Sequence, residues 1–273
     1  MTQTEIDTGT DELLASRQGG VVTLTMNRAD SRNALTLAMV EAMAAQLERA
    51  ETDNGVRCVV LTGAGKGFCS GGDVKGFASA ANAEPMLPDA AIRLQRRLQR
   101  DTAGRLRHMP KPTLAAINGA AAGAGLALAL ACDMRIMVDS AVMVTSFSRV
   151  GLSGDFGGTY LLSHLLGPAK ARELYFLSPK LSAEEALAIG LVNRLVGAGE
   201  FNASVFQTAQ ALASGPTIAL GYMKENLNRA LSASFEECMD IEATHHIHCF
   251  QTADHKEAAA AFMRREEPIF HGR

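Results

Sequence analysis

The sequence has neither an excess of basic charge nor a long hydrophobic run. Its 273 residues include 26 Lys and Arg against 29 Asp and Glu, a formal net charge of −3 at pH 7. Surfaces that bind nucleic acid are strongly basic, so this composition gives no reason to expect nucleic acid as a partner. No apolar run reaches the ~18 residues that a transmembrane helix needs, so no membrane span is expected.

Cysteine is scarce and shows no disulfide pattern. The cysteines are odd in number and lack framework spacing: Cys58, Cys69, Cys132, Cys238 and Cys249. Reduced thiols in a cytoplasmic protein explain them most simply. Residues 1–18 are acidic and polar and lack the apolar centre of a secretory signal, which also favours a cytoplasmic location. We expect these residues to be loosely attached to the fold.

Apolar side chains are plentiful enough for one large domain, or for one domain with an appendage. Hydrophobic residues make up 47% of the chain and charged residues 20%. Strands are predicted at residues 21–26, 57–62, 113–117 and 134–138, and residues 190–196 are predicted to form a turn that leads into a final strand. Thr36 is predicted to cap a helix that runs to about residue 50. Further helices are predicted at residues 89–108, 126–132, 158–166, 168–177 and 183–189. From about residue 200 the pattern indicates three further helices, so a strand-rich core precedes a helical tail.

The stretch KPTLAAINGAAAGAGLALALACD, residues 111–133, combines a strand, a turn of small residues and a buried helix. Gly123 and Gly125 flank Ala124 in the turn, and the apolar run after them has no polar face. The first amides of a helix have no acceptor within it, and glycine allows a ligand to approach the backbone. This pattern predicts an anion site, although a tight turn packed beneath another helix would have the same composition.

A second glycine-rich turn follows the predicted strand at 57–62. The segment GAGKGFCSGGDVKGF, residues 63–77, is not a Walker loop, because its Gly-Lys pair is followed by glycine instead of Ser or Thr. It places Gly72 in a turn that resembles the one around Ala124. Two turns of this kind can direct two backbone amides at one oxygen, which is the arrangement of an oxyanion hole.

Several motifs, taken in order, resemble the crotonase superfamily, the enoyl-CoA hydratases and isomerases. They are LTMNRADSRNAL, VVLTGAGKGFCSGGDVK, KPTLAAINGAAAGAGLALALACDMRI, VGLSGDFGGTYLL, LSAEEALAIGLVNRLV and TADHKEAAAAFMRREEPIF. The similarity spans about residues 20–270. It implies an α/β fold, in which a spiral of repeated ββα units precedes a C-terminal helical trimerisation region. Residues 1–199 would form the acyl-CoA-binding and catalytic core, and residues 200–273 the oligomerisation region.

The resemblance also implies an acyl-CoA thioester substrate, a homo-trimer or a hexamer of two trimers, and no cofactor beyond the coenzyme A moiety of the substrate. The amides of Gly72 and Ala124 would stabilise a thioester enolate. Residues 77–108 are expected to shape the acyl pocket. The coenzyme A moiety would be bound by residues of two segments, namely Arg28, Arg32, Ser70, Gly71, Asp73, Val74 and Lys75.

The sequence departs from the family at the two glutamates that its hydratases use. Ala127 and Phe147 occupy these positions, and neither can exchange a proton, so ordinary hydratase activity is expected to be weak or absent. Asp155, within GLSGDFGG, lies where some family members carry an aspartate that faces the thioester. One carboxylate and an oxyanion hole suffice to move a double bond through a dienolate. A partly buried aspartate would have the raised pKa that suits this task.

The leading prediction is therefore an enzyme that isomerises an enoyl-CoA with Asp155 as the base. Another enolate-type reaction on an acyl-CoA stays open: hydration, hydrolysis, decarboxylation or dehalogenation. So does an inactive scaffold that binds CoA thioesters and has lost catalysis with its glutamates. For Asp155 itself, the alternative is a helix cap that takes no part in the chemistry. His245 and His248 have the spacing to share a metal ion, but no second cluster would complete its coordination, so no metal is expected. Cys69 is expected to be a core residue.

Overall fold

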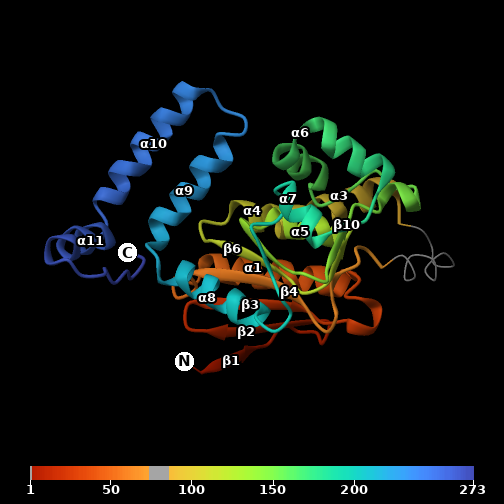
Figure 1. The fold of residues 1–273 in the computed structure, drawn as a ribbon, viewed down its shortest axis with the longest axis horizontal. Coiled ribbons are helices and arrows are strands. Elements are labelled where there is room, and N and C mark those ends of the chain that lie inside the picture. Colours follow the sequence, from red (N-terminus) through yellow and green to blue (C-terminus); the bar gives the residue numbers. More distant parts are fainter. Residues whose placement is uncertain (1, 74–85) are drawn as a thin grey trace.

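The computed structural model describes residues 2–73 and 86–273, and these form an α/β structure built on two sheets (Figure 1). The larger sheet has seven strands in the order β1-β2-β3-β4-β6-β8-β11, and the smaller has four in the order β10-β9-β7-β5. In chain order the strands are β1 (Gln3–Ile6), β2 (Leu13–Gln18), β3 (Val21–Met26), β4 (Cys58–Gly63), β5 (Gly67–Cys69), β6 (Thr113–Ile117), β7 (Ala120–Ala122), β8 (Met134–Val138), β9 (Val142–Val144), β10 (Leu181–Ser182) and β11 (Arg194–Val196).

A ββα unit repeats along the chain and produces a spiral. In the pairs β4–β5, β6–β7 and β8–β9, the first strand joins the large sheet, the second joins the small sheet, and a helix follows. Corresponding strands of successive units are parallel neighbours: β4 pairs with β6 and β6 with β8, while β5 pairs with β7 and β7 with β9. Successive units therefore place their second strands, and the loops after them, side by side. This architecture confirms the expected fold class.

The helices of the core are α1 (Leu37–Thr52), α3 (Pro88–Gln99), α4 (Arg105–His108), α5 (Ala124–Ala131), α6 (Gly158–Leu177) and α7 (Ala183–Ala188), with short 3₁₀ segments η1 (Ala29–Ser31) and η4 (Phe147–Val150) and the π-helical segment η3 (Arg100–Gly104). α1 begins where the Thr36 side chain accepts a hydrogen bond from the Met39 amide at 3.1 Å, as its sequence predicts. α6 is kinked at Gly167 (φ 77°), which separates the two predicted helices.

The N-terminal residues are an integral part of the large sheet, so the prediction that they are loosely attached is wrong. β2 runs antiparallel to β3, with Leu13 paired with Met26, and β1 pairs in turn with β2. Leu13 and Ala15 are buried, and Leu14 between them is exposed. This alternation of buried and exposed side chains identifies a strand with one buried face. It extends over too few residues to be recognised within the polar sequence around it.

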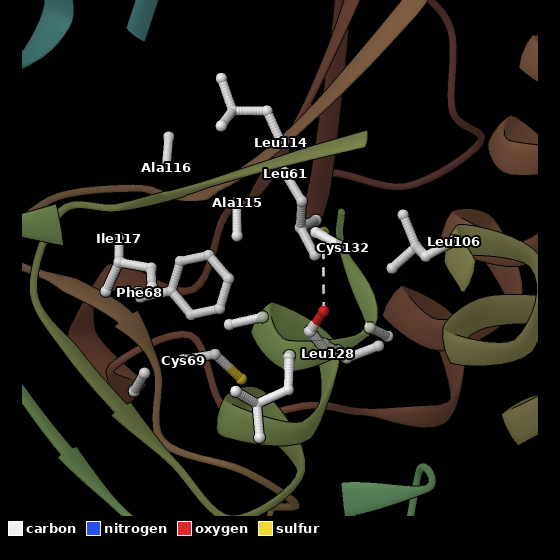
Figure 2. Close-up of a cluster of buried hydrophobic side chains, with 14 of the residues drawn as sticks. Leu61, Phe68, Cys69, Leu106, Leu114, Ala115, Ala116, Ile117, Leu128 and Cys132 are labelled. Carbon is white, nitrogen blue, oxygen red and sulfur yellow. Dashed lines mark hydrogen bonds between the residues drawn. The ribbon is translucent and has the colours of Figure 1, made fainter. Parts of the chain in front are cut away.

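The core contains strands that are covered on both faces. Figure 2 shows the side chains of β6 alternating, with Leu114 and Ala116 on one side and Ala115 and Ile117 on the other. Phe68 lies on the side of Ala115 and Ile117, against α5. All of these side chains are buried. Burial on both faces accounts for the continuous apolar run by which this strand was predicted.

The C-terminal tail contains α8 (Phe201–Ser214), α9 (Thr217–Arg229), α10 (Phe235–Phe250) and α11 (Ala253–Arg264), one helix more than predicted. Only Gln251 and Thr252 separate α10 from α11, and this break contains neither Gly nor Pro. α8 packs on strands of the core, whereas α9, α10 and α11 stand away from the sheets (Figure 1). Buried Lys224 of α9 ties the tail to the core through an ion pair with Asp133, 2.9 Å from Nζ to Oδ2.

None of the helices in the described ranges, 2–73 and 86–273, is long and apolar enough to cross a membrane.

Candidate functional site

A cavity of about 540 Å³ brings together the two glycine-rich turns and the loop that contains Asp155. Gly71 and Gly72 line it from the turn after β5, and Gly123 and Ala124 line it at the start of α5. These segments are far apart in sequence, but the parallel neighbours β5, β7 and β9 carry their loops to one place. The three sequence-predicted catalytic positions therefore share one cavity.

The two turns approach so closely that side chains would not fit between them. A Cβ added to Gly71, whose φ is +94°, would lie 3.1 Å from the carbonyl oxygen of Ala122 and 3.4 Å from the amide nitrogen of Ala124. A Cβ added to Gly125 would lie 2.5 Å from the Cβ of Cys69. Glycine is required at both positions, and this contact fixes the start of α5 against the turn that contains Gly72.

The amides of Gly72 and Ala124 are not used by regular secondary structure. Leu35 and Gly72 form a parallel bridge, in which the Leu35 amide donates to the Gly71 carbonyl at 2.8 Å. The carbonyl and N–H of one trans peptide point in opposite directions, so the Gly72 N–H points away from Leu35. Ala124 is the first residue of α5, and its N–H has no acceptor within that helix. Two amides that border one cavity are suited to binding an oxyanion.

Asp155 is a half-buried carboxyl whose Oδ1 is buried and has no hydrogen-bond partner among the described residues. Burial disfavours the charged form and raises the pKa of Asp155 to about 6. α6 begins after Gly157 without a side-chain cap, so the alternative in which Asp155 caps this helix is wrong. An unpaired carboxyl with a pKa near neutrality can exchange protons with a ligand.

The family model described as enoyl-CoA hydratase/isomerase matches residues 16–273. The chain belongs to the enoyl-CoA hydratase/isomerase family. It is 36% identical over 263 residues to the 1,2-epoxyphenylacetyl-CoA isomerase of Escherichia coli, covering 96% of this chain and 98% of that one. It is also 31% identical over 262 residues to the short-chain-enoyl-CoA hydratase of Clostridium acetobutylicum, covering 94% and 96%.

A solved enoyl-CoA hydratase structure from Bacillus anthracis has a TM-score of 0.88 and 29% identity, covering 96% of this chain and 100% of that one. The names of the relatives include both isomerases and hydratases. The comparisons therefore give the family and leave the individual reaction to be argued from the site.

This enoyl-CoA hydratase/isomerase family member has no carboxyl at either expected glutamate position. Ala127 is buried in α5, and Phe147 lines the cavity and stacks on Tyr175 with 5.8 Å between ring centroids. Among the described residues that line the cavity, the carboxyls are those of Asp73 and Asp155. Asp73 forms an ion pair with Arg28 at 3.0 Å. Asp155 is thus the cavity carboxyl best placed to act on a bound ligand.

Most of the described residues that are predicted to bind coenzyme A line one of two neighbouring cavities. Ser70, Gly71 and Asp73 line the cavity itself. Arg32 lines an adjoining cavity of about 370 Å³, to which Ser70 and Asp73 also contribute. Val74 and Lys75 fall outside the described residues. The two cavities share the turn after β5, so a ligand that fills both would pass over this turn.

Arg28 lines neither of these two cavities. Besides its ion pair with Asp73, its Nε lies 3.4 Å from Glu12, and its Nη1 donates to the Ala34 carbonyl at 2.8 Å. In this structure Arg28 therefore holds the turn that contains Asp73. The sequence does not single out Glu12, because it belongs to the N-terminal segment that is predicted to be loosely attached.

Residues 77–108, which are predicted to shape the acyl pocket, contribute an apolar wall to this cavity through their described part. Ala91, Leu94 and Leu98 of α3 line the cavity, as does Met86 before it. The arginines of α3 do not line the cavity, so the face of the helix that borders it is the apolar one. Cys69 is fully buried, and burial raises its thiol pKa to about 12, so it is the core residue that was predicted.

Proposed function

We propose that this protein isomerises the double bond of an enoyl-CoA, with Asp155 as the acid–base group and the amides of Gly72 and Ala124 as the oxyanion hole. The observation that carries the proposal is the carboxyl of Asp155, which is partly buried, has an unpaired oxygen and lines the same cavity as both amides. The other described carboxyl that lines this cavity, that of Asp73, forms an ion pair with Arg28.

In the proposed reaction the thioester oxygen accepts hydrogen bonds from the two amides. Asp155 takes a proton from C4 or C2, and the resulting dienolate places negative charge on that oxygen, where the amides stabilise it. Asp155 then returns the proton to the other carbon, so the double bond moves and no atom is gained or lost. A pKa near 6 suits this role, because the carboxyl must accept a proton and later release it.

Ala127 and Phe147 favour isomerisation over hydration. Adding water across the double bond requires one group to activate the water and another to protonate the α-carbon. Ala127 and Phe147 replace the two glutamates that perform these tasks in the family's hydratases. A single carboxylate can shuttle one proton, and that is sufficient for isomerisation.

The proposed substrate is an acyl-CoA thioester, and no cofactor beyond its coenzyme A moiety is required. Ser70, Gly71 and Asp73 would contact this moiety, together with Val74 and Lys75, and Arg32 would face its phosphates from the adjoining cavity. Arg28 would contribute mainly by holding Asp73. The proposed assembly is a homo-trimer, or a hexamer of two trimers.

The test is to incubate the protein with a panel of saturated and unsaturated acyl-CoAs in deuterated water and to follow mass and double-bond position by mass spectrometry. We expect deuterium incorporation and double-bond migration for at least one enoyl-CoA, without addition of water. Brisk hydration of crotonyl-CoA would contradict the assignment of Ala127 and Phe147. Binding of acyl-CoAs without exchange would favour an inactive scaffold, and loss of another group would favour hydrolysis, decarboxylation or dehalogenation.

A further inference from the structure

We infer that Gln99 is a positioning residue, which holds the loop of Asp155 from the side opposite to the substrate. The Oε1 atom of Gln99 accepts a hydrogen bond from the Phe156 amide at 2.8 Å. This bond joins the end of α3 to the residue that directly follows Asp155 in the chain. The inference rests on the proposed function, because it assigns Gln99 a role in the reaction of Asp155.

The backbone on both sides of Asp155 adopts conformations that need external support. Gly154 has φ +117°, Phe156 φ +47° and Gly157 φ +75°. Of these three residues, Phe156 is the one whose backbone needs support, because a residue with a Cβ rarely adopts a left-handed conformation. Such a conformation persists only when surrounding contacts fix it, and these sites often lie beside catalytic groups. The bond from the Phe156 amide to Gln99 is a contact of this kind.

The carboxyl of Asp155 depends on this loop for its position. Its Oδ1 has no hydrogen-bond partner in the described part of the chain, so side-chain bonds to that atom do not orient it. The main-chain carbonyl oxygen of Asp155 accepts a hydrogen bond from the Gly158 amide at 3.0 Å, and this bond ties the loop to the start of α6. The Gln99 bond supplies the tie on the other side, to α3. Rotation of the peptide between Asp155 and Phe156 would move the carboxyl relative to the two hole amides.

The helix that carries Gln99 is irregular at this point. Gln99 ends α3, and the π-helical segment η3 follows it. The Thr102 hydroxyl donates to the Leu98 carbonyl at 2.7 Å within this irregular turn. π-helical turns are rare and are frequently found at functional sites. Here the turn comes directly after the residue that reaches the Asp155 loop.

Gln99 acts without contacting the space proposed for the substrate. Leu98 lines the cavity that contains Asp155, whereas Gln99 lines a separate cavity of about 710 Å³. Phe156 borders both cavities. The hydrogen bond therefore lies in the wall between them, so its loss should alter the placement of Asp155 more than the binding of the acyl-CoA.

The test compares Gln99→Met, which keeps the length of the side chain but removes the acceptor, with Gln99→Glu, which keeps an acceptor oxygen. A control, Gln207→Met, makes the same change at an exposed position of α8. We expect Gln99→Met to lower kcat on the order of 10- to 10²-fold with little change in KM, because small misplacements of a catalytic group have effects of this size. Gln99→Glu should restore most of the wild-type kcat when assayed at about pH 8, where Asp155 is ionised.

Hydrogen–deuterium exchange gives a second readout that does not depend on activity. The amide of Phe156 should exchange faster in Gln99→Met than in the wild type, and Gln99→Glu should remain slow. Unchanged exchange or unchanged kcat in Gln99→Met would overturn the inference, as would an equal loss of kcat in both variants. A wild type without activity on any acyl-CoA would contradict the proposed function, and the exchange rates would still decide whether Gln99 holds the loop.

Discussion

At the scale of single residues, the partly buried carboxyl of Asp155 predicts how activity depends on pH. Asp155 must be ionised to accept a proton, and its pKa is raised to about 6 by burial. We therefore expect kcat/KM to increase with pH through a midpoint near 6 and to level off above it. Solvent-deuterium exchange rates between about pH 4 and pH 8 measure this midpoint. A midpoint near the ordinary value of an aspartate would mean that the carboxyl is solvated in the free enzyme.

The same burial predicts an unusual effect on stability. The pKa of Asp155 increases from 3.8 to about 6 on folding, so ionisation favours the unfolded state. The contribution of Asp155 to the free energy of unfolding is fully present below pH 3.8 and is lost as the pH increases through about 6. Asp155→Asn removes this loss and should raise Tm at pH 8 by on the order of a few degrees, with no gain at pH 4.

Calorimetry of the wild type and Asp155→Asn at both pH values checks this prediction. Most substitutions destabilise a protein, so a gain that appears only at the higher pH would be diagnostic. A variant less stable than the wild type at both pH values would indicate that Asp155 has a structural role.

The sequence alone identified Asp155 as a candidate, because its motif and the missing glutamates could be read directly. Its burial, its unpaired oxygen and the absence of a cap could not, since they depend on residues from other elements. Gln99 was not predicted for the same reason, because its partner lies 57 positions further along the chain. Arg28 was predicted to face the ligand, but its ion pairs involve residues whose proximity the local pattern did not indicate.

At the scale of elements, the start of α5 can be tested by removing one amide without breaking the helix. Ala124 is the first residue of α5, and proline is well tolerated at the first position of a helix. Ala124→Pro should therefore fold, bind acyl-CoA and lose on the order of 10²- to 10³-fold in kcat, the usual effect of removing one oxyanion-hole donor. Steady-state kinetics and thermal unfolding measure both parts of this expectation.

Ala253→Pro is the matched control, because Ala253 is the exposed first residue of α11, on the tail. It should leave activity unchanged. If Ala124→Pro keeps full activity, the Ala124 amide is not part of an oxyanion hole. If it fails to fold while Ala253→Pro folds, the close packing of α5 against Cys69 is the first explanation to examine.

Elements with a strong pattern were predicted well, and some short elements without one were not. β4, β6 and β8 are mostly apolar because both faces are covered, and the predicted strands at 57–62, 113–117 and 134–138 match them closely. β7 consists of three alanines, which have no periodicity to read, so it was predicted as part of a turn. α5 starts at Ala124, two residues before the predicted start, because Ala and Gly in its first turn resemble loop residues.

At the scale of the whole molecule, α9, α10 and α11 carry apolar side chains that the single chain leaves exposed. On these three helices the largest exposed fractions belong to Leu227 (70%), Phe235 (71%), Phe262 (82%) and Met263 (81%). Large apolar side chains left exposed in one part of a molecule often mark an interface between subunits. We therefore expect light scattering to give about three or six times the 28.9 kDa mass of the chain.

Phe262→Lys should shift this distribution towards the monomer at micromolar concentration, because it places a charge in the expected interface. Leu14→Lys, at a partly exposed apolar position of β2, is the control and should not. A wild type that is monomeric under these conditions would contradict the proposed assembly. Because α8 packs on the core, a truncated protein that tests the role of the tail in assembly should keep α8 and end at Ser214, before α9.

The central claim is that Asp155 moves the proton, and the most direct test is the rate of deuterium exchange and double-bond migration in Asp155→Asn. Asparagine keeps the size of the side chain but cannot act as the base. The variant should stay folded, bind acyl-CoA and lose about 10²- to 10⁴-fold in both rates. Asp240→Asn, at an exposed carboxyl of α10, should retain wild-type rates. If Asp155→Asn also retains near-wild-type rates, another group is the base and the account of this site is wrong.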